Sequence, residues 1–441
     1  HQTFVQSDLE IVSPGKKQKS RRIVEARILS EATFSPDGKR VTYLASNAGL
    51  AGQTQLMSID TRGGKETCHT RRLDRVVGVA LQVHGPARIR SRFVTTEDGN
   101  GCYFPVTDGG TAHLYRLGLT GREKTTALTT GQRVCHLLAG NTKHLLFTSQ
   151  DPNHPPELFA LDIESGEERA LTHHNDKWLA RMRLPEVEHV TVNTDKGITV
   201  EGWVLVPKQV RRPCKTILVI HGGPHSGYGN SFNFDFQELV GEGYAVAYAN
   251  PRGSTGYGDK FSTAIVGCWG DPELKDFNTF LDRLVSLGIS DPDRLGVTGI
   301  SGGGHLTGWL VGHTKRFKAA VAEQGVYNML SMWGTSDAGK ALIELEMGGA
   351  IHKIPEVYWA RSPLAHAHKC KTPTLLIQGE NDIRCPMEQA EQMYAALLDA
   401  GCTTGLVRLQ GCSHGTQISG RPALRRYRMN VQKDWFARYL K

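Results

Sequence analysis

The segment GVTGISGGGHLTGWL (residues 296–310) places six glycines around a single serine, Ser301. The apolar residues before Ser301 are typical of a strand and those after it of a helix, so the serine lies at a strand-to-helix turn. Two chemistries use such a turn. One binds the pyrophosphate of a dinucleotide against bare glycine backbone, and the other exposes a serine as a nucleophile. The rest of the sequence has to distinguish them.

Residues 186–441 alternate apolar strand-like segments with helical ones. The helical segment DPELKDFNTFLDRLVSLG (residues 271–288) carries apolar side chains on one face; they are Phe277, Phe280, Leu281, Leu284 and Leu287. Strands that are apolar on both faces and alternate with helices form a doubly wound, mostly parallel sheet. We therefore predict a C-terminal α/β domain over residues 186–441.

Residues 1–185 read instead as short strands separated by turns. Three similar phrases place Leu56, Leu114 and Leu158 in equivalent positions, 58 and 44 residues apart. One four-stranded propeller blade takes roughly 40–50 residues, so the second spacing fits one blade. We predict a short or partial β-propeller of about three or four blades here, with unrelated β-hairpins as the alternative.

A dinucleotide site would need more than the glycines of this turn. A fingerprint begun by Gly302 and Gly304 requires a third glycine three positions further on, where the sequence has Thr307. Glu323 does follow at about the distance of a ribose-binding acid. A nicotinamide-dependent oxidoreductase is therefore kept only as an outsider.

The nucleophile interpretation is supported by two residues later in the chain. A serine nucleophile on an α/β sheet needs an acid and then a histidine, each at the end of a later strand. Asp382 comes after the apolar segment TPTLLIQGEN, and His414 comes after GLVRLQGCS. Either residue alone is a common loop residue. The order Ser301, Asp382, His414 is the order that an α/β hydrolase requires, and we predict these three as the catalytic residues.

A second glycine pair is expected to complete the site. The segment ILVIHGGPH ends an early strand with Gly222 and Gly223, where side chains cannot block the approach of a substrate carbonyl. The backbone N–H groups of Gly223 and Gly302 are therefore our candidates for binding an oxyanion.

From about residue 155 onward the chain resembles the prolyl oligopeptidase family of serine peptidases, in its acylaminoacyl-peptidase branch. The resemblance rests on HGGPH, NPRGSTGYG, WGDPELKD, GISGGG, DIRCP, GCSHG and GRPALRRYR. It implies an N-terminal β-propeller joined to a C-terminal α/β-hydrolase domain, an active site between them, and cleavage of short or N-acylated peptides through an acyl-enzyme. The propeller portion is about half the length that the family pattern leads us to expect, and glycine follows Ser301 directly.

Four further residues are candidates for substrate binding. Arg252, in NPRGSTGYG, would bind a substrate carboxylate or else brace its own loop. Trp309, Tyr327 and Trp333 would line an acyl pocket or else pack in the core.

Composition excludes several other classes. The net charge is +8, and the basic segment GKKQKSRR near the N-terminus suggests nucleic acid only weakly, because no aromatic residues accompany it.

Nine cysteines without a CxxC pair fit a reducing compartment; Cys402 and Cys412 are the one pair considered for a disulfide. His366, His368 and Cys370 superficially offer metal ligands, and their alternating spacing would put both histidines on one strand face, but no partner cluster is evident in the sequence. We expect no cofactor, metal, nucleic acid or membrane partner.

The sequence lacks a segment apolar enough to span a membrane, and its first ten residues lack the pattern of a signal peptide. We therefore expect a cytoplasmic serine peptidase that acts on short or N-blocked peptides. The family resemblance is also compatible with a homo-oligomer. The alternatives are a carboxylesterase of the same fold and a non-catalytic propeller binding module.

Overall fold

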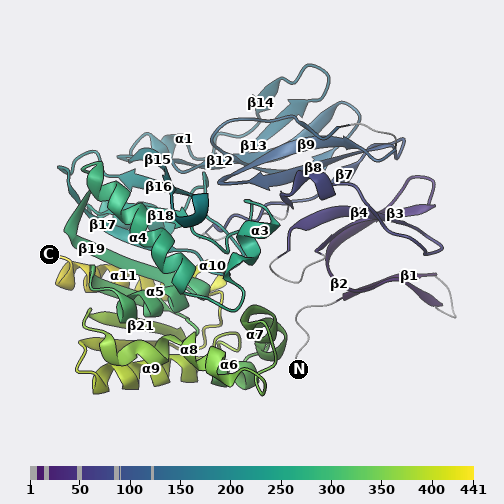
Figure 1. The fold of residues 1–441 in the computed structure, drawn as a ribbon. Helices are drawn as coiled ribbons and strands as arrows, with labels where there is room; N and C mark the ends of the chain where they lie inside the picture. The colour runs from purple at the N-terminus through teal and green to yellow at the C-terminus, as the bar shows by residue number, and fades with distance from the viewer. Residues whose placement is uncertain (1–6, 14–18, 47–51, 84–88, 90, 121–123) are drawn as a thin grey trace.

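A computed structural model describes residues 7–13, 19–46, 52–83, 89, 91–120 and 124–441 of the chain. Two regions differ in architecture (Figure 1). The N-terminal region contains β-sheets, and the C-terminal region is a sheet covered by helices. Residues 15–18 of the basic segment GKKQKSRR lie outside the described residues.

The N-terminal region contains a five-stranded and a nine-stranded sheet, which together comprise three antiparallel units of four strands, the second and third of them in the larger sheet. The strands of the first unit are β2 (Ser20–Phe34), β3 (Arg40–Ser46), β4 (Thr54–Asp60) and β5 (Thr67–Cys68), with β1 (Ser7–Val12) paired to β2. Those of the second are β7 (Val94–Thr95), β8 (Gly101–Asp108), β9 (Thr111–Gly118) and β10 (Thr126–Ala127). Those of the third are β11 (Val134–Gly140), β12 (His144–Asp151), β13 (His154–Asp162) and β14 (Glu168–Ala170).

The three leucines that define the repeat occupy equivalent strands. Leu56 lies on β4, Leu114 on β9 and Leu158 on β13, the third strand of each unit. Leu56 and Leu114 are fully buried, whereas Leu158 is half-buried. The longer spacing between Leu56 and Leu114 has a structural cause: additional residues connect the first unit to the second. They include the short helix η2 (Arg71–Leu73) and strand β6 (Val76–Val77), which pairs with β8.

The C-terminal region is built on an eight-stranded sheet of order β15-β16-β18-β17-β19-β20-β21-β22. The first two pairings are antiparallel and all others are parallel, which confirms the predicted doubly wound sheet. The strands are β15 (Glu186–Asn193), β16 (Thr199–Val206), β17 (Cys214–Ile220), β18 (Ala245–Asn250), β19 (Ser290–Ile300), β20 (Phe317–Glu323), β21 (Thr374–Gly379) and β22 (Thr404–Leu409).

Helices cover both faces of this sheet because its strands bury alternate side chains on opposite sides. Leu218 and Ile220 of β17 pack into one core, and Ile217 and Val219 pack into the other. The first core is shared with α4 (Asp271–Ser286), α5 (Gly302–His313) and α9 (Met387–Asp399), and the second with α2 (Phe234–Gly241) and α11 (Pro422–Tyr439). Helix α4 buries four of its five predicted apolar residues. The exception is Leu287, which follows the last turn and is 41% exposed.

The remaining helices lie around the carboxyl ends of the strands and in the connections. Helices α6, α7 and α8 share an apolar cluster of their own. Their bounds and those of the other short helices are α1 (Asp176–Leu179), η3 (Asp195–Gly197), α3 (Asp259–Ser262), η4 (Thr263–Ile265), α6 (Met329–Thr335), α7 (Gly339–Met347), α8 (Pro355–Ala360), η5 (Pro363–Lys369) and α10 (Thr416–Ser419).

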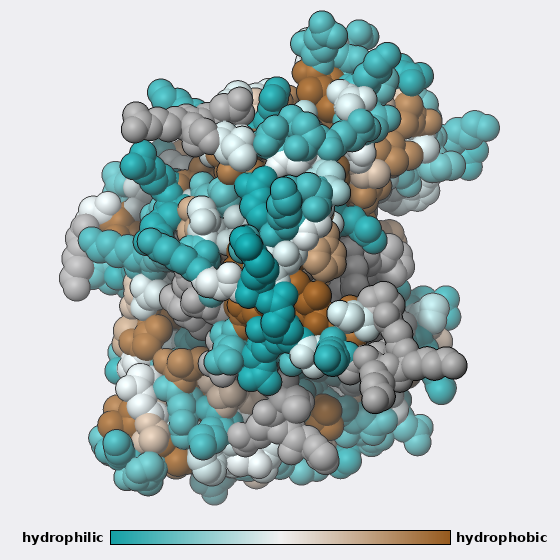
Figure 2. Space-filling model, turned by 90° about the vertical axis from the view of Figure 1, so that its right-hand side faces the viewer, coloured by the Kyte–Doolittle hydropathy of each residue, from teal (hydrophilic) through white to brown (hydrophobic). Residues whose placement is uncertain are grey.

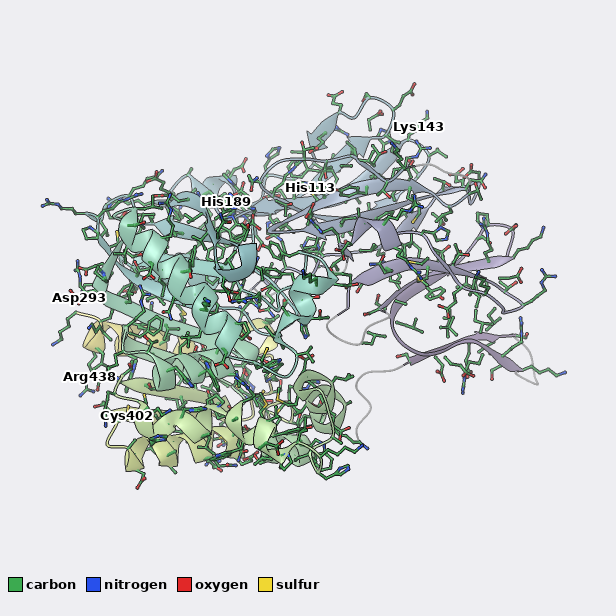
Figure 3. The ribbon with its side chains drawn as sticks, in the orientation of Figure 1. His113, Lys143, His189, Asp293, Cys402 and Arg438 are labelled. Atoms are coloured by element: carbon green, nitrogen blue, oxygen red, sulfur yellow. The ribbon has the colours of Figure 1, made fainter. Side chains whose placement is uncertain are left out.

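Close backbone packing joins the two regions. The turn between β8 and β9 lies against the loop after β17: the Asn230 N–H donates to the Gly110 carbonyl at 2.8 Å, and the Gly110 N–H donates to Glu201 at 3.0 Å. Figure 3 shows His189, which hydrogen-bonds the same Glu201 carboxylate, on the side of the C-terminal region that faces the β-sheets. In the view turned by 90°, hydrophilic side chains are spread over the visible face, and apolar ones show near its centre as well as toward its upper right and lower left (Figure 2).

Two possibilities considered for histidine and cysteine do not hold in the structure. His366 and His368 lie on the 3-10 helix η5 and not on a strand, and the described residues contain no cluster of metal-ligating side chains. Cys402 lies 3.7 Å from the sulfur of Cys370 rather than beside Cys412, and all nine cysteines are free. Figure 3 places Cys402 on the side of the molecule away from the N-terminal β-sheets.

Among the described helices, none has the length and apolar character needed to span a membrane.

Candidate active site

Ser301 stands between the end of β19 and the start of α5, as the sequence predicts. Its backbone angles, φ 60° and ψ −119°, lie in a region that residues other than glycine seldom adopt. The turn is tight because its neighbours lack side chains. A Cβ atom on Gly303 would lie 2.2 Å from the carbonyl oxygen of Ile220, so the helix can approach β17 only with glycine there.

The three predicted catalytic residues meet at the carboxyl ends of the parallel strands. Ser301 Oγ lies 3.0 Å from Nε2 of His414, and Nδ1 of His414 lies 2.8 Å from Oδ2 of Asp382. Because a carboxylate only accepts hydrogen bonds, His414 carries its proton on Nδ1 and leaves Nε2 to accept from the serine hydroxyl. A hydrogen-bonded chain of this geometry is suited to activating a serine nucleophile.

Asp382 is held by the turn that follows β21. Its side chain is buried, and Oδ1 accepts hydrogen bonds from the backbone N–H groups of Arg384 and Cys385, both at 2.9 Å. These two bonds leave Oδ2 directed at His414. The carboxylate therefore has a fixed position relative to the imidazole.

Gly302 and Gly223 lie next to each other beside the serine. A Cβ atom on Gly302 would come within 3.1–3.2 Å of the backbone atoms of Gly223. Within the described chain, no backbone carbonyl accepts a hydrogen bond from the Gly223 N–H. The Gly302 N–H is the first of α5, where an N–H group has no partner within the helix. Both predicted donors thus flank Ser301 in a position suited to a developing oxyanion.

The loop of residues 221–227, here called the oxyanion loop, has several of its partners within the C-terminal region. His221 Nδ1 lies 2.8 Å from the Gly222 carbonyl, and burial lowers the pKa of His221 to about 4, so the ring is neutral at pH 7. His225 bonds Glu346 of α7 at 2.9 Å and the Gly253 carbonyl at 2.9 Å. His225 therefore ties the oxyanion loop to α7 and to the loop that follows β18.

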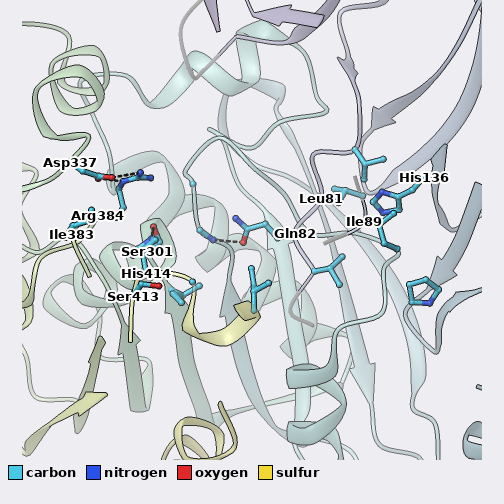
Figure 4. A pocket seen from close by; sticks show the side chains of 18 of the residues that line it. Leu81, Gln82, Ile89, His136, Ser301, Asp337, Ile383, Arg384, Ser413 and His414 are labelled. Atoms are coloured by element: carbon cyan, nitrogen blue, oxygen red, sulfur yellow. Dashed lines mark hydrogen bonds and ion pairs between the residues drawn. The ribbon is translucent and has the colours of Figure 1, made fainter. Parts of the chain in front are cut away.

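Ser301 and His414 line a cavity of about 700 Å³ that both regions of the molecule enclose (Figure 4). Leu81, Gln82, Ile89 and His136 come from the N-terminal region, and Ile300, Asp337, Ile383 and Arg384 come from the C-terminal region. The cavity lies between the two regions, where the family resemblance leads us to expect an active site.

Four residues considered for substrate binding do not line this cavity. Arg252 is bound to Asp276 and to Asp195, so it braces its own loop. Trp309 and Tyr327 are buried in the core, and Trp333 packs in the cluster of α6 to α8 with its N–H bonded to Glu344. For these aromatic residues the core-packing alternative agrees with the structure.

The acid considered for a dinucleotide is also occupied. Both oxygens of Glu323 accept hydrogen bonds from the buried guanidinium of Arg428, at 2.8 and 2.9 Å. A ribose hydroxyl would have to displace this ion pair. The structure therefore removes the support that Glu323 gave to the oxidoreductase alternative.

Two features of the cavity are not predicted by the sequence. Arg384 pairs with Asp337 at 2.6 Å, and its guanidinium holds the pKa of that carboxyl below the ordinary value. The other is Gln82, whose Oε1 accepts a hydrogen bond from the Gly222 N–H at 3.0 Å. The sequence signal for Gln82 is the longer of the two leucine spacings, because the additional residues between Leu56 and Leu114 include Gln82.

The fold and the arrangement of the site define the class of the protein: an α/β hydrolase with a serine at its nucleophile turn, joined to part of a β-propeller. Residues 230–441 match the model described as the prolyl oligopeptidase family. This match over the C-terminal residues confirms the resemblance seen in the sequence.

Three relatives illustrate the match. The chain is 36% identical over 387 residues to "Uncharacterized peptidase YuxL" of Bacillus subtilis, covering 86% of this chain and 58% of that protein. It is 36% identical over 193 residues to the acylamino-acid-releasing enzyme of Arabidopsis thaliana, covering 42% of this chain and 25% of that enzyme. The structure of acylaminoacyl peptidase from Pyrococcus horikoshii superposes with a TM-score of 0.86 and 26% identity, covering all of this chain and 67% of that one. The chain therefore spans no more than about three-fifths of the length of the two curated relatives named here.

Proposed function

We propose that this protein is a serine peptidase that hydrolyses short or N-acylated peptides through an acyl-enzyme intermediate. The observation that carries the proposal is the hydrogen-bonded chain from Ser301 through His414 to Asp382, beside two glycine N–H groups, in a cavity between the two domains. The alternative within the same chemistry is a carboxylesterase that acts on small esters.

In the first half of the reaction, Ser301 Oγ attacks the carbonyl carbon of the scissile bond while His414 Nε2 takes the hydroxyl proton. The C–O bond forms, and the carbonyl π electrons move onto oxygen, where the N–H groups of Gly223 and Gly302 stabilise them. The intermediate collapses with cleavage of the C–N bond, and the departing amine takes the proton from His414. Asp382 keeps the imidazole in orientation and stabilises its cation.

In the second half, a water molecule attacks the acyl-enzyme while His414 again accepts a proton. The C–O bond to Ser301 breaks, and the serine oxygen recovers its proton from His414. The products are a carboxylic acid and the free amine. Every acid–base step in this scheme is performed by side chains of the chain itself.

The charges in the cavity favour a blocked N-terminus. Among the described residues that line it, Asp337 is the one carboxylate, and the Arg384 guanidinium already binds it in two places, at 2.6 and 3.0 Å. A free ammonium group entering the cavity would therefore meet no unpaired carboxylate. The aliphatic residues Leu81, Ile89, Ile383 and Ile418 suit an acyl group or an apolar side chain.

The test compares kcat/KM for acetyl-alanine p-nitroanilide, alanine p-nitroanilide and p-nitrophenyl acetate, with Ser301→Ala as the blank. Anilide cleavage requires protonation of the leaving amine and accurate positioning, whereas an activated ester requires much less of either. We expect cleavage of the acetylated anilide to exceed that of the free-amine anilide by about tenfold or more, with loss of all activity in Ser301→Ala. Ester turnover alone would establish the carboxylesterase, and a preference for the free amine would contradict the N-acyl substrate.

A further inference from the structure

Residues 78–83, here called the cavity segment, run from the N-terminal β-sheets to the active site. At one end they are attached to β8: the Gly78 N–H donates to the Pro105 carbonyl at 2.8 Å, and the Ala80 N–H donates to Thr107 Oγ1 at 3.0 Å. The Thr107 hydroxyl in turn donates to the Gly78 carbonyl at 2.8 Å. The segment is therefore positioned by the β-sheet and does not hang free over the cavity.

At its other end the cavity segment is attached to the oxyanion loop. Leu81 forms a parallel β-bridge with Gly227, and the Gln82 N–H donates to the Gly227 carbonyl at 2.8 Å. The Ser226 hydroxyl donates to the Ala80 carbonyl at 3.2 Å. These contacts hold the backbone of Gln82 beside the loop, so its side chain reaches Gly222 from a fixed origin. Figure 4 shows that side chain extending to the loop near Ser301 and His414.

The hydrogen bond from the Gly222 N–H to Gln82 lies where side-chain sterics restrain the backbone conformation very little. Gly222 and Gly223 lack side chains, and Gly223 has φ 125°, so sterics alone permit many orientations of the peptide between them. The Gly222 carbonyl and the Gly223 N–H belong to that one peptide. His221 bonds its carbonyl, and Gln82 bonds the N–H of the peptide just before it. Both sides of Gly222 are thereby fixed.

We propose that Gln82 is a positioning residue for the oxyanion loop: its side-chain carbonyl, supplied by the N-terminal β region, sets the orientation of the Gly223 N–H. Gln82 makes no bond to the reacting atoms in this role and acts through Gly222. The inference deepens the proposed function, on which it rests, and it makes the catalytic site of the α/β domain dependent on the β region.

The test compares Gln82→Ala and Gln82→Met with the wild-type chain. Methionine approximates the length and volume of glutamine but cannot accept the Gly222 N–H, so a hydrogen-bonding role predicts the same defect in both variants. We expect kcat for p-nitrophenyl acetate and for acetyl-alanine p-nitroanilide to fall about tenfold, with KM changed less than about twofold. The apparent Tm of each variant, measured alongside, shows that the chain is folded.

A peptidyl trifluoromethyl ketone gives a readout that general loosening of the fold does not move. Ser301 Oγ adds to its carbonyl carbon, the hydroxyl proton passes to His414, and the carbonyl electrons become an oxyanion between Gly223 and Gly302. We expect its Ki to rise about tenfold in both variants, matching the fall in kcat/KM, because transition-state affinity is what changes. A product such as acetyl-alanine should bind as in the wild type.

Gln132→Ala is the matched control. Gln132 is also a glutamine of the β region that bonds the α/β domain, through Asn230 Nδ2 at 3.0 Å, and Asn230 keeps a second acceptor in the Gly110 carbonyl. It does not line the cavity, and we expect its kcat to stay within about twofold of the wild type.

Recovery of activity in Gln82→Met, or a fall in kcat without a matching rise in the Ki of the ketone, would overturn the proposal. If the wild-type chain cleaves the ester but not the anilide, the peptidase function fails while the comparison of Gln82 variants on the ester still decides the role of this residue.

Discussion

At the scale of single residues, the site depends on positions where a side chain is absent. Ser301 adopts φ 60° only because β19 and α5 determine the backbone on either side of it, and such strain is retained where it exposes a reacting group. Gly302 and Gly303 keep the strand, helix and oxyanion loop within contact distance. The chemistry of the turn therefore depends as much on its glycines as on its serine.

Gly302→Ala is predicted to damage catalysis more than stability. The added Cβ would press on backbone atoms of Gly223 at 3.1–3.2 Å and move the loop by a few tenths of an ångström. We expect kcat to fall by about ten- to a hundredfold, with little change in KM, in steady-state assays on the ester and the anilide.

Gly334→Ala serves as the control for that change. Gly334 lies in α6, a Cβ atom there meets nothing within 4 Å, and alanine favours a helix by about 0.5–1 kcal/mol. Its kcat should equal that of the wild type. A wild-type kcat in Gly302→Ala as well would show that close contact between Gly302 and Gly223 is not needed for catalysis.

At the scale of elements, helix α4 shows how burial of an apolar face affects a charged group at the helix start. Glu273, in the first turn, accepts a hydrogen bond from the Gly270 N–H at 2.9 Å. Burial, with a smaller contribution from nearby Asp276, raises the pKa of Glu273 to about 8 against the opposing effects of the backbone N–H groups and Arg252. The carboxyl group is therefore protonated in the folded protein at neutral pH.

Glu273→Gln is predicted to flatten the dependence of stability on pH. A carboxyl group with a raised pKa binds its proton more tightly when folded, so its contribution to stability is complete below about pH 4.5 and is lost as the pH rises through about 8. The slope that it adds is up to about 1.4 kcal/mol per pH unit within that window. Urea unfolding at pH 5, 6.5 and 8 should show a shallower decline in the variant.

The exposed Glu356, in the first turn of α8, provides the comparison. Glu356→Gln should keep the slope of the wild type because this side chain remains in water. An unchanged slope in Glu273→Gln would mean that Glu273 is ionised in the folded protein.

At the scale of the whole molecule, the two domains approach one another through backbone that admits no side chain. A Cβ atom on Gly229 would lie 2.2 Å from the Gly110 carbonyl, and one on Gly110 would lie 2.0 Å from the ring of the buried Trp203. The loop after the oxyanion loop therefore fits directly onto the turn between β8 and β9.

Gly229→Ala is predicted to weaken this packing, since the overlap is relieved only by moving one domain away from the other. Overpacking of this kind costs about 1–3 kcal/mol, and we expect the apparent Tm to fall by about 2–5 °C. Gly241→Ala, at the exposed end of α2 where a Cβ meets nothing within 4 Å, should leave Tm unchanged. Equal Tm values for the two variants would contradict a tight contact at Gly229.

Much of the fold could be predicted because its signals are local. The alternation of apolar strands and helices, and the repeat marked by Leu56, Leu114 and Leu158, depend on periodicities within short segments. The positions of Ser301, Asp382 and His414 could be predicted for a related reason: parallel strands end at one edge of a sheet, so residues just after them are brought together.

The tertiary structure alone decided which side chains surround that site. Trp309, Tyr327 and Trp333 have the composition of a binding pocket, but the packing of α5 and α6 places them away from the cavity. Gln82 stands 140 residues before Gly222, and no spacing or periodicity relates the two. The sequence by itself determined the sheet, the repeats and the order of Ser301, Asp382 and His414 at the strand ends, because these depend on neighbours along the chain. Contacts between the domains depend on how two separately formed surfaces fit, which only the folded structure specifies.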